Sequence, residues 1–424
     1  MIREDWAEAK LEDMLDYIQP TNYIVESTKY SENYKIPVLT AGKSFILGYT
    51  NEEHNVFKDT PVIIFDDFTT ATQFVNFKFK VKSSAMKILV RTSKLVNIKY
   101  VFYYMQTIRY NTDTHKRYWI SIFSKLPIKI APLPEQRAIV AKIEQLFSGL
   151  DNGITNLIKA KEKLEIYRQA VLKKAFEGEL TKEWREKQND VSSDISYVYL
   201  RELADVATGA TPKKSNSSYW NEGDIAWVTS GALNNTFVKE ASDFITEKAL
   251  KETNCKVFPK GTLLIAMYGE GKTRGKCSEL AIDAATNQAI AAVLIKNEYQ
   301  KSKKYLKWFF IKNYNDIRML SSGGVQPNLN LTKVKETRIP FPTNQEQEQI
   351  VKEIETRLSI CDHISANIDA GLEKVEALRQ SILKKAFEGT LLSEDVLEAC
   401  HNEPDWEPAK KFLERIKRNE EVEI

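Results

Sequence analysis

The chain has 424 residues, which is enough for two or three domains that each bury a core of their own. Its hydrophobic share of 42% is ordinary for a globular protein, and no apolar run approaches the ~20 residues of a membrane-spanning helix, so we expect no membrane partner. A formal net charge of +3 excludes a general binder of polyanions, so any contact with nucleic acid must come from local basic patches.

The N-terminus and the dispersed cysteines and histidines predict a cytoplasmic protein without a metal or catalytic centre. MIREDWAEAK, at residues 1–10, is charged and lacks the apolar stretch of a signal peptide. The 4 cysteines and 4 histidines contain no two pairs at the spacing of metal ligands. We therefore expect reduced thiols, a cytoplasmic location, no metal site and no catalytic residue in this chain.

Residues 1–131 form the first predicted domain, which we expect to be a compact mixture of helices and strands. The segments TPVIIFDDF (60–68) and NFKFKVKSS (76–84) are typical of strands. Asp66 and Asp67 resemble a metal-binding carboxylate pair, but a metal site would need further ligands. We interpret them as strand-end residues that can accept a hydrogen bond from a cytosine.

Residues 132–184 predict a proline junction followed by a long helix. The segment begins with PLPEQ, whose prolines disfavour helix upstream. Apolar or small residues then recur at alternating steps of three and four from Ile143 to Val171, which is the heptad pattern of a coiled-coil seam. Gly178 is suited to end the helix, and a helix of about 40 residues spans roughly 60 Å.

A polar linker at 185–196 leads to the second predicted domain at 197–342. This domain is again rich in β-branched and aromatic residues, and we expect another compact mixed α/β fold. DIAWVTSG (224–231) and GTLLIAMYG (261–269) are typical of strands that end in glycine turns.

The segment AMYGEGKT (266–273) fits the looser form of a nucleotide phosphate-binding loop. Such a loop needs a helix directly after it, whose N-terminus faces the phosphates. Gly275 disfavours that helix, and NQAIAAVLI (287–295) is typical of a short buried strand instead. We therefore interpret the segment as a basic, glycine-rich loop on a sheet, carrying Lys272, Arg274 and Lys276.

An internal repeat organises the whole chain. LKKAFEG occurs at 172–178 and again, verbatim, at 383–389, and the same register holds upstream without a gap to the start of each helix. Residues 343–392 therefore predict a second long helix, preceded by a second proline pair, and residues 393–424 a charged C-terminal tail.

The second helix carries its own apolar seam. It runs from Ile354 to Ile382 and is interrupted at Arg357, where the neighbouring Leu358 could substitute. Two similar seams on one chain favour pairing with each other. The alternative is that each seam pairs with a second molecule, and the pattern by itself leaves the orientation of the two helices open.

The order of these motifs resembles the specificity subunit of a Type I DNA restriction-modification system. The first half matches in IPVLTAGKSFILGYT (36–50) and in the proline-to-helix junction, but IIFDDFTTATQF (63–74) stands where later family motifs would be. The second half carries the pattern more fully, in LADVATGATPKKSNSSYW (203–220), GDIAWVTSGAL (223–233), MYGEGKTRGK (267–276), TNQAI (286–290) and GGVQPNLNLTKV (323–334).

The resemblance implies an α+β protein with two target-recognition domains separated by two long helices that pair as an antiparallel coiled coil. It implies sequence-specific reading of a bipartite site in double-stranded DNA, without catalysis by this chain. The implied partners are two methyltransferase subunits and restriction/translocase subunits. S-adenosylmethionine, ATP and Mg²⁺ would belong to those partners, and this chain would carry no cofactor.

Polar and basic residues on the loops of both domains are the candidates for contact with DNA. Base edges are read by amides, hydroxyls, Arg and Lys, and phosphates are held by Lys, Arg and small residues. The candidates in the first domain are Lys43, Tyr49, Thr69, Thr70, Gln73, Arg109, Tyr110, Lys116 and Arg117, and those in the second are Thr211, Lys213, Lys214, Ser215, Tyr219, Lys272, Thr273, Arg274, Lys276, Gln326 and Asn328.

Two alternatives from other classes remain open at this point. An ATP-dependent nuclease or a fused methyltransferase would bind ATP or S-adenosylmethionine itself, but the chain lacks a recognisable Asn/Asp-Pro-Pro-aromatic motif and a glycine-rich methyl-donor motif. A coiled-coil scaffold would pair through the helices and bind no DNA.

Overall fold

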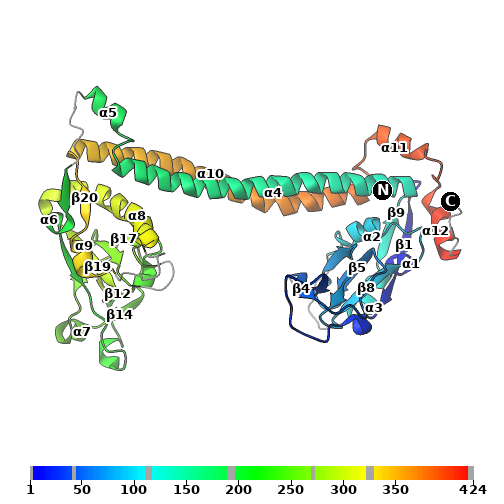
Figure 1. Cartoon of the computed structure of the whole chain (residues 1–424), viewed down its shortest axis with the longest axis horizontal. Coiled ribbons are helices and arrows are strands. Elements are labelled where there is room, and N and C mark those ends of the chain that lie inside the picture. The colour runs from blue at the N-terminus through cyan, green and yellow to red at the C-terminus, as the bar shows by residue number, and fades with distance from the viewer. Residues whose placement is uncertain are drawn as a thin grey trace. The chain divides into compact units, whose positions relative to one another are not determined.

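A computed structural model describes residues 3–40, 44–109, 117–188, 196–268, 273–320 and 329–418, the side chains of 315–320 excepted. The contacts divide the chain into two compact units (Figure 1). Unit 1 comprises Met1–Leu157 and Asp369–Ile424, and unit 2 comprises Ile158–Ile368. Each unit therefore contains one mixed domain and a part of both long helices.

The domain of unit 1 is built on two small sheets and a two-stranded ribbon. The antiparallel four-stranded sheet has the order β2 (Leu15–Ile18), β8 (Met86–Arg91), β5 (Val62–Asp66), β6 (Thr72–Val75). The three-stranded sheet has the order β4 (Ile46–Thr50), β3 (Ile36–Leu39), β7 (Lys80–Val81), and the ribbon pairs β1 (Ala7–Lys10) with β9 (Pro127–Ile130). Short helices connect them: α1 (Leu11–Met14), η1 (Pro20–Tyr23), α2 (Ile98–Met105), α3 (Tyr118–Ser121) and η2 (Phe123–Lys125).

The buried strand β5 confirms the interpretation of VIIFD as a strand, because an uninterrupted apolar run suits a strand covered on both faces. In NFKFKVKSS, Phe77, Phe79 and Val81 alternate with lysines, a pattern that predicts buried apolar residues and solvent-facing lysines, and this holds only in part. Phe79 and Val81 are buried, but Lys80 between them is buried as well, with its ammonium 2.8 Å from the carboxylate of Glu52. An ion pair therefore lets a lysine occupy a position that the pattern assigned to solvent.

The domain of unit 2 has larger mixed sheets. One has the order β11 (Ala204–Thr208), β19 (Ile290–Ile295), β16 (Leu263–Ala266), β17 (Cys277–Leu280), β13 (Phe237–Val238). The other has the order β14 (Asp243–Ile245), β12 (Ile225–Val228), β18 (Ala284–Thr286), β15 (Val257–Phe258), and a ribbon pairs β10 (Tyr197–Tyr199) with β20 (Arg338–Pro340). The helices are α6 (Leu200–Leu203), η3 (Ser217–Tyr219), η4 (Ser230–Ala232), α7 (Glu247–Glu252), η5 (Asn297–Ser302), α8 (Lys303–Leu320) and α9 (Leu331–Lys335).

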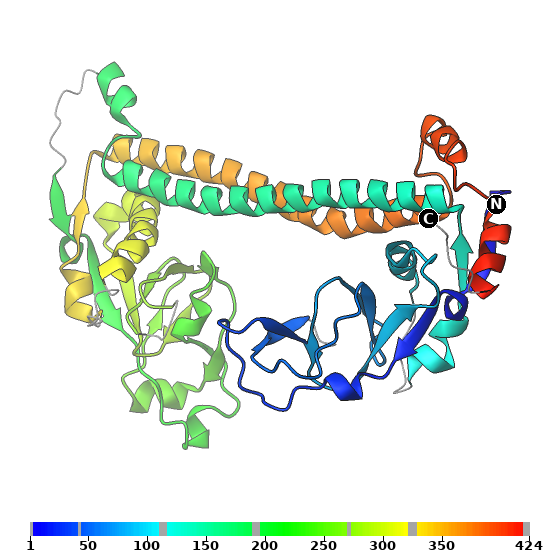
Figure 2. The ribbon, with the colours of Figure 1, turned by 45° about the vertical axis from the view of Figure 1, so that its right-hand side comes forward.

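The two long helices are α4 (Leu133–Phe176) and α10 (Asn344–Phe387), each 44 residues long. They lie side by side in both ribbon views (Figures 1 and 2). Each ends at the glycine that the repeat predicted, since Gly178 and Gly389 both have φ 77°, a left-handed conformation that favours glycine. The verbatim repeat LKKAFEG thus forms the last turns and the stop signal of both helices.

The helices pair with each other, and in each unit they run antiparallel. In unit 1, Ile143 near the start of α4 shares a core with Phe387 at the end of α10, while Asp151, further along α4, forms an ion pair with Arg379, an earlier residue of α10. The order of contacts along one helix is therefore the reverse of that along the other.

The contacts in unit 2 repeat this arrangement. Phe176, at the end of α4, shares a core with Ile350 near the start of α10, and Arg168 lies 2.6 Å from Asp362. In the register of the internal repeat, Asp362 corresponds to Asp151 and Arg168 to Arg379, so the two ion pairs are equivalent. Pairing within the chain is thereby confirmed, and the duplicated sequence forms a duplicated structure.

The heptad reading was wrong at some seam positions. Tyr167, Ile364 and Leu378 fit the three-four pattern but are more than 40% exposed. Leu358 is buried in place of Arg357, whose guanidinium pairs instead with Glu353 on the same helix. A straight helix drifts relative to a strict seven-residue repeat, so the buried stripe shifts along the helix.

The stretch interpreted as a charged tail folds onto unit 1. It forms α11 (Glu394–His401) and α12 (Ala409–Arg418), and Phe412 of α12 is buried among core residues of the first domain. The backbone N–H of Ala409 donates to the carbonyl of Asp5 at 3.0 Å. The beginning of the predicted linker is also structured, because α5 covers Lys182–Lys187. In the part of the chain that the structure describes, none of the helices is both long and apolar enough to cross a membrane.

Candidate nucleic-acid interface

Two sequence motifs of unit 2 meet at one place on its domain. The hydroxyl of Thr208 donates to the carbonyl of Ile290 at 3.0 Å, and that of Thr211 to the side-chain oxygen of Gln288 at 2.5 Å. Gly209 lies so close that a Cβ there would come 1.8 Å from the carbonyl oxygen of Thr286. Only glycine therefore allows the loop 209–220 to pack against the TNQAI segment.

Lys214 holds the loop 209–220 in place from within. Its ammonium lies 2.9 Å from the Asp243 carboxylate and 3.5 Å from the centre of the Trp220 ring, which packs edge-on against Trp227. The hydrogen bond from Lys214 holds the pKa of Asp243 below its usual value. Trp227 is buried and belongs to the core of the domain. Lys214 therefore has partners within the domain, but its side chain is still 60% exposed, and its contact to DNA stays a prediction.

The other candidates on this loop have different surroundings. Lys213 and Ser215 are exposed, whereas the hydroxyl of Tyr219 donates to Glu252 of α7 at 3.0 Å. The loop packs against β14 and α7, which lie at the end of the domain remote from α4 and α10 (Figure 1). Lys213 and Ser215 thus stand at the outer end of unit 2, free to face a ligand.

Replacing Lys214 by alanine tests whether it positions this loop. We expect DNA binding to weaken by about 0.5–1 kcal/mol, roughly two- to fivefold, because the loop loses its cation–π contact and its ion pair. Lys214→Arg keeps a cation over Trp220 and should restore most of the affinity. Hydrogen exchange of the loop amides separates the two roles: faster exchange in Lys214→Ala marks a positioning residue, and unchanged exchange with weaker binding would mark a direct contact instead.

The two strands on either side of the glycine-rich segment, β16 and β17, pair as an antiparallel hairpin. Thr273 is followed by a turn at Arg274 and Gly275, where Gly275 has φ 82°, and the chain then enters β17, antiparallel to β16. The region after Thr273 is therefore a strand and not the helix that a phosphate-binding loop requires. Lys276 lies 2.5 Å from the side-chain oxygen of Asn234, so it ties the hairpin to a neighbouring loop.

Arg274 is the candidate on this hairpin that keeps unused hydrogen-bonding capacity. It is half-buried, and its Nε is buried without a hydrogen-bond partner in the described structure. A half-buried guanidinium carries further N–H donors besides this buried Nε, and such donors suit a ligand oxygen or a base edge.

The carboxylates of Asp66 and Asp67 serve the fold of unit 1. Asp66 accepts hydrogen bonds from the backbone N–H of Phe68 and from the hydroxyl of Thr69, at 2.9 and 2.6 Å. Asp67 accepts from the backbone N–H of Trp119 at 2.9 Å. Both are buried. The expectation that they accept a hydrogen bond from a cytosine is therefore wrong, because both already bind within the domain. Among the described residues, no three potential ligands gather as a metal site would need.

The tip of the β5–β6 hairpin brings several candidates of unit 1 together. Thr69 is exposed, Thr70 has φ 60°, and Gln73 is exposed on β6. The backbone N–H of Tyr118 donates to the carbonyl of Asp67, so Arg117, which is exposed, stands beside this tip. The sequence did not single out Phe68, which is 45% exposed at the same turn.

The remaining candidates are scattered. Tyr49 is half-buried on β4, opposite Pro37 of β3. Arg109 is exposed just beyond α2 and lines a pocket against α10. Predictions for six further residues fall outside the described residues: Lys43, Tyr110, Lys116, Lys272, Gln326 and Asn328.

The fold thus defines a duplicated protein in which each copy joins a mixed domain, with polar and basic loops, to one helix of an antiparallel pair. The sequence model of the family described as "Type I restriction modification DNA specificity domain" matches residues 3–160 and 192–374, once in each copy. The chain belongs to this family, and as a specificity subunit it recognises a DNA target.

Relatives and solved structures agree with this assignment. The specificity subunit of the Type I restriction enzyme EcoR124I/EcoR124II of Escherichia coli is 32% identical over 384 residues, which cover 87% of this chain and 90% of the relative. That of EcoKI from Escherichia coli (strain K12) is 23% identical and covers 88% of this chain and 78% of the relative.

Two solved structures share the fold. The HsdS subunit from Thermoanaerobacter tengcongensis superimposes with a TM-score of 0.56 at 15% identity, covering 92% of this chain and 98% of that one. A chain from a structure of assembly and conformational transition in the type I R-M system gives a TM-score of 0.64 at 17% identity, covering 92% of this chain and 100% of that one.

Proposed function

We propose that this chain reads a bipartite DNA target, one half with the domain at 1–131 and the other with the domain at 197–342. The observation that carries the proposal is the duplication: two domains, each joined to a helix, with equivalent ion pairs Asp151–Arg379 and Asp362–Arg168. Two readers on one chain contact two half-sites, and the length of the helices that connect them sets the spacer.

Arg274 is the residue for which we expect the clearest contribution to affinity. Arg274→Ala should weaken binding to the cognate site by about 1–3 kcal/mol if the guanidinium contacts a base through two hydrogen bonds. Lys352→Ala, which removes an exposed cation from α10, is the matched control and should leave affinity unchanged. A titration in which both variants bind like the parent would remove Arg274 from the interface.

The chain itself is proposed to be non-catalytic and to carry no cofactor. S-adenosylmethionine would be bound by methyltransferase partners, and ATP and Mg²⁺ by restriction/translocase partners. The hairpin after Thr273 supports this, because a strand replaces the helix that would bind nucleotide phosphates. Binding of ATP or S-adenosylmethionine by the isolated chain would contradict it.

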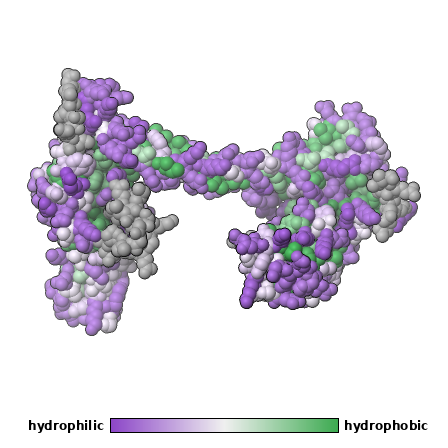
Figure 3. Space-filling view, in the orientation of Figure 1, coloured by the Kyte–Doolittle hydropathy of each residue, from purple (hydrophilic) through white to green (hydrophobic). Residues whose placement is uncertain are grey.

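Exposed apolar side chains on the helix pair support protein partners. In unit 2, five large apolar residues of α4 and α10 are between 41% and 66% exposed, namely Ile158, Ile166, Tyr167, Ile360 and Ile364. Hydrophobic residues are visible along the helices in Figure 3. Since large apolar side chains are costly to leave in water, we propose that methyltransferase helices cover them. The duplication favours two copies of that partner, and restriction subunits would join the resulting complex.

Mapping methylated adenines in a host that carries this chain and a methyltransferase tests the function. The proposal expects two short specific half-sites separated by a non-specific spacer of constant length. Exchanging residues 197–342 for those of another specificity subunit should change one half-site and leave the other as it was. A continuous methylated site, or a change in both halves, would contradict the bipartite reading.

A further inference from the structure

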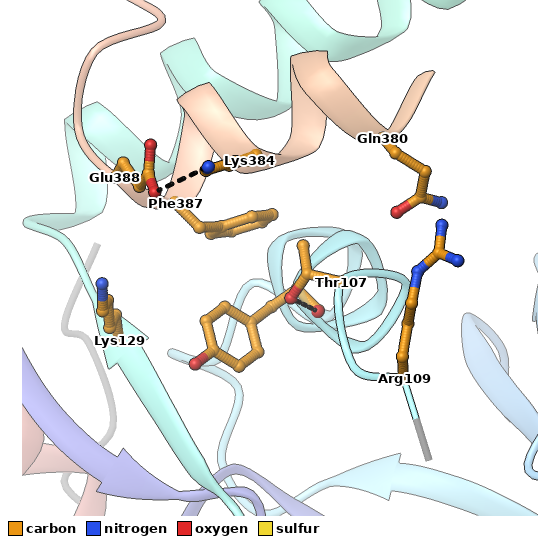
Figure 4. Close-up of a pocket in the computed structure, with 8 residues that line it drawn as sticks. Thr107, Arg109, Lys129, Gln380, Lys384, Phe387 and Glu388 are labelled. Atoms are coloured by element: carbon orange, nitrogen blue, oxygen red, sulfur yellow. Dashed lines mark hydrogen bonds and ion pairs between the residues drawn. The ribbon is translucent and has the colours of Figure 1, made fainter. Parts of the chain in front are cut away.

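A pocket of about 360 Å³ opens in unit 1 between the end of α2 and the last turns of α10 (Figure 4). Arg109, one of the candidate DNA contacts of unit 1, lies in its wall. The residues that line it come from α2 and the segment after it, from β9 and from α10: Tyr104, Thr107, Arg109, Lys129, Gln380, Lys384, Phe387 and Glu388.

An aromatic wall makes one side of the pocket apolar and rigid. Phe387 is buried, and its ring packs edge-on against the rings of Tyr104 and Tyr100, with centroids 5.0 and 5.2 Å apart. The hydroxyl of Tyr100 donates to the carbonyl of Lys129 at 2.9 Å, which fixes β9 beside the pocket. In Figure 4 the Lys129 ammonium stands at one side and the Arg109 guanidinium at the other, near Gln380.

Positive charge is in excess around this pocket. Lys384 is paired with Glu388 at 3.9 Å on the same helix. Arg109 and Lys129 have no carboxylate at ion-pair distance among the described residues, even though Glu8 faces Lys129 across the β1–β9 ribbon. Two unpaired cations beside aromatic rings suit a ligand with a carboxylate next to an apolar group.

The helix side of the pocket is duplicated in unit 2. Gln380, Lys384, Phe387 and Glu388 of α10 correspond in the repeat to Gln169, Lys173, Phe176 and Glu177 of α4. The ring of Phe176 packs against Tyr305 and Phe309 at 5.2 and 5.4 Å, and Lys173 pairs with Glu177 at 3.8 Å.

The fold requires only some of the residues that are identical in the two copies of LKKAFEG. Leu, Ala and Phe of LKKAFEG are buried in both copies, and the glycine ends the helix. Both lysines and the glutamate are exposed in both copies, so packing of the core does not require them to be the same. Identical exposed residues at two equivalent places are expected if both places bind the same partner.

We propose that the pocket is an anchoring point for a methyltransferase subunit, which inserts an apolar side chain flanked by a carboxylate. The proposal rests on the proposed function and gives the chemistry of one contact. The end of α4 would provide the second, less cationic anchor, because Pro340 occupies the position of Lys129 there and its carbonyl accepts from Tyr305 at 2.6 Å. A recessed pocket with an aromatic wall and unpaired cations is typical of protein interfaces and is not required by a DNA backbone.

Charge reversal at the pocket tests this with the full chain and its methyltransferase. Lys129→Glu and Arg109→Glu should each reduce the number of bound methyltransferases from two to one in native mass spectrometry, at a concentration where the parent binds two. The affinity of the lost site should fall at least about tenfold, because a carboxylate would then face a carboxylate.

Lys410→Glu is the matched control. Lys410 is exposed on α12 of the same unit, lies outside the repeat and does not line the pocket, so this variant makes the same change in charge and should retain both partners. Thermal unfolding of all variants should stay close to that of the parent, since Arg109 is exposed and Lys129 only half-buried.

The outcomes are distinguishable. Two methyltransferases bound with unchanged affinity to both pocket variants would overturn the anchor and leave the proposed function intact. Two bound methyltransferases with weakened DNA binding would assign the pocket to the DNA backbone and overturn the anchor as well. A parent chain that binds no methyltransferase would refute the proposed partner, and the anchor with it.

Discussion

Inserting one heptad into both long helices should lengthen the non-specific spacer of the DNA target by about three base pairs, at about 3.4 Å per base pair, while each half-site stays the same. The insertions belong between Leu157 and Ile158 in α4 and between Ile368 and Asp369 in α10, where the chain passes from one unit to the other. Seven residues add about 10 Å of helix, and they make almost two full turns, so the buried seam is retained.

Footprints of the assembled complex on a library of spacer lengths measure this effect. On the original spacer we expect specific affinity to fall by roughly 10³-fold or more, toward non-specific binding, since both half-sites can no longer be contacted at once. Insertion into one helix alone is the control, because it mismatches the helix pair and should impair binding at every spacer length. An unchanged preferred spacer in the double insertion would refute the idea that the helices set the distance.

Phe412→Ala should destabilise unit 1 by about 3–5 kcal/mol and leave unit 2 unaffected. Phe412 is 1% exposed and packs, with Leu413 and Ile416 of α12, into the core that includes Trp6 and Leu11 of the first domain. Alanine would leave a cavity in this core that the neighbouring side chains fill only in part.

Hydrogen exchange resolved by residue distinguishes the two units. Amides of β1, β5 and β8 should lose protection in Phe412→Ala, whereas those of β16 and β19 should exchange as in the parent. Lys410→Ala, on the exposed face of the same helix, should change stability by less than about 0.5 kcal/mol. Equal loss of protection in both units would mean that α12 stabilises the whole chain and does not act as a part of unit 1.

Much of the architecture could be predicted from the sequence, because it depends on short-range conformational preferences and on an internal repeat. The proline pair, the apolar residues from Ile143 to Val171 and the glycine that follows predicted a helix close to the observed α4, since each signal acts within a few residues of itself. The repeat LKKAFEG then predicted α10 without further information. Gly275 correctly argued against a helix after Thr273, where the structure has a turn and a strand.

The candidate site was less predictable, because a side chain's availability depends on partners far away in sequence. Lys214 and Asp67 were both considered for DNA contact as polar residues on loops. Their partners are Asp243 and Trp220 for Lys214, and the backbone of Trp119 for Asp67, and no local pattern reveals such pairs. The same limit applies to the pocket, which joins residues of α2, β9 and α10.

The sequence by itself determined the duplication, the two helices and the points where they end, since these follow from periodicity, backbone preferences and identity between two copies. Only the tertiary structure decided that the helices run antiparallel, that the C-terminal segment completes the first domain, and which polar loop residues remain free. Those features depend on contacts such as Asp151–Arg379 and Asp5–Ala409, whose members are separated by most of the chain. When two residues are so far apart in sequence, the whole fold decides whether they are buried and whether they pair.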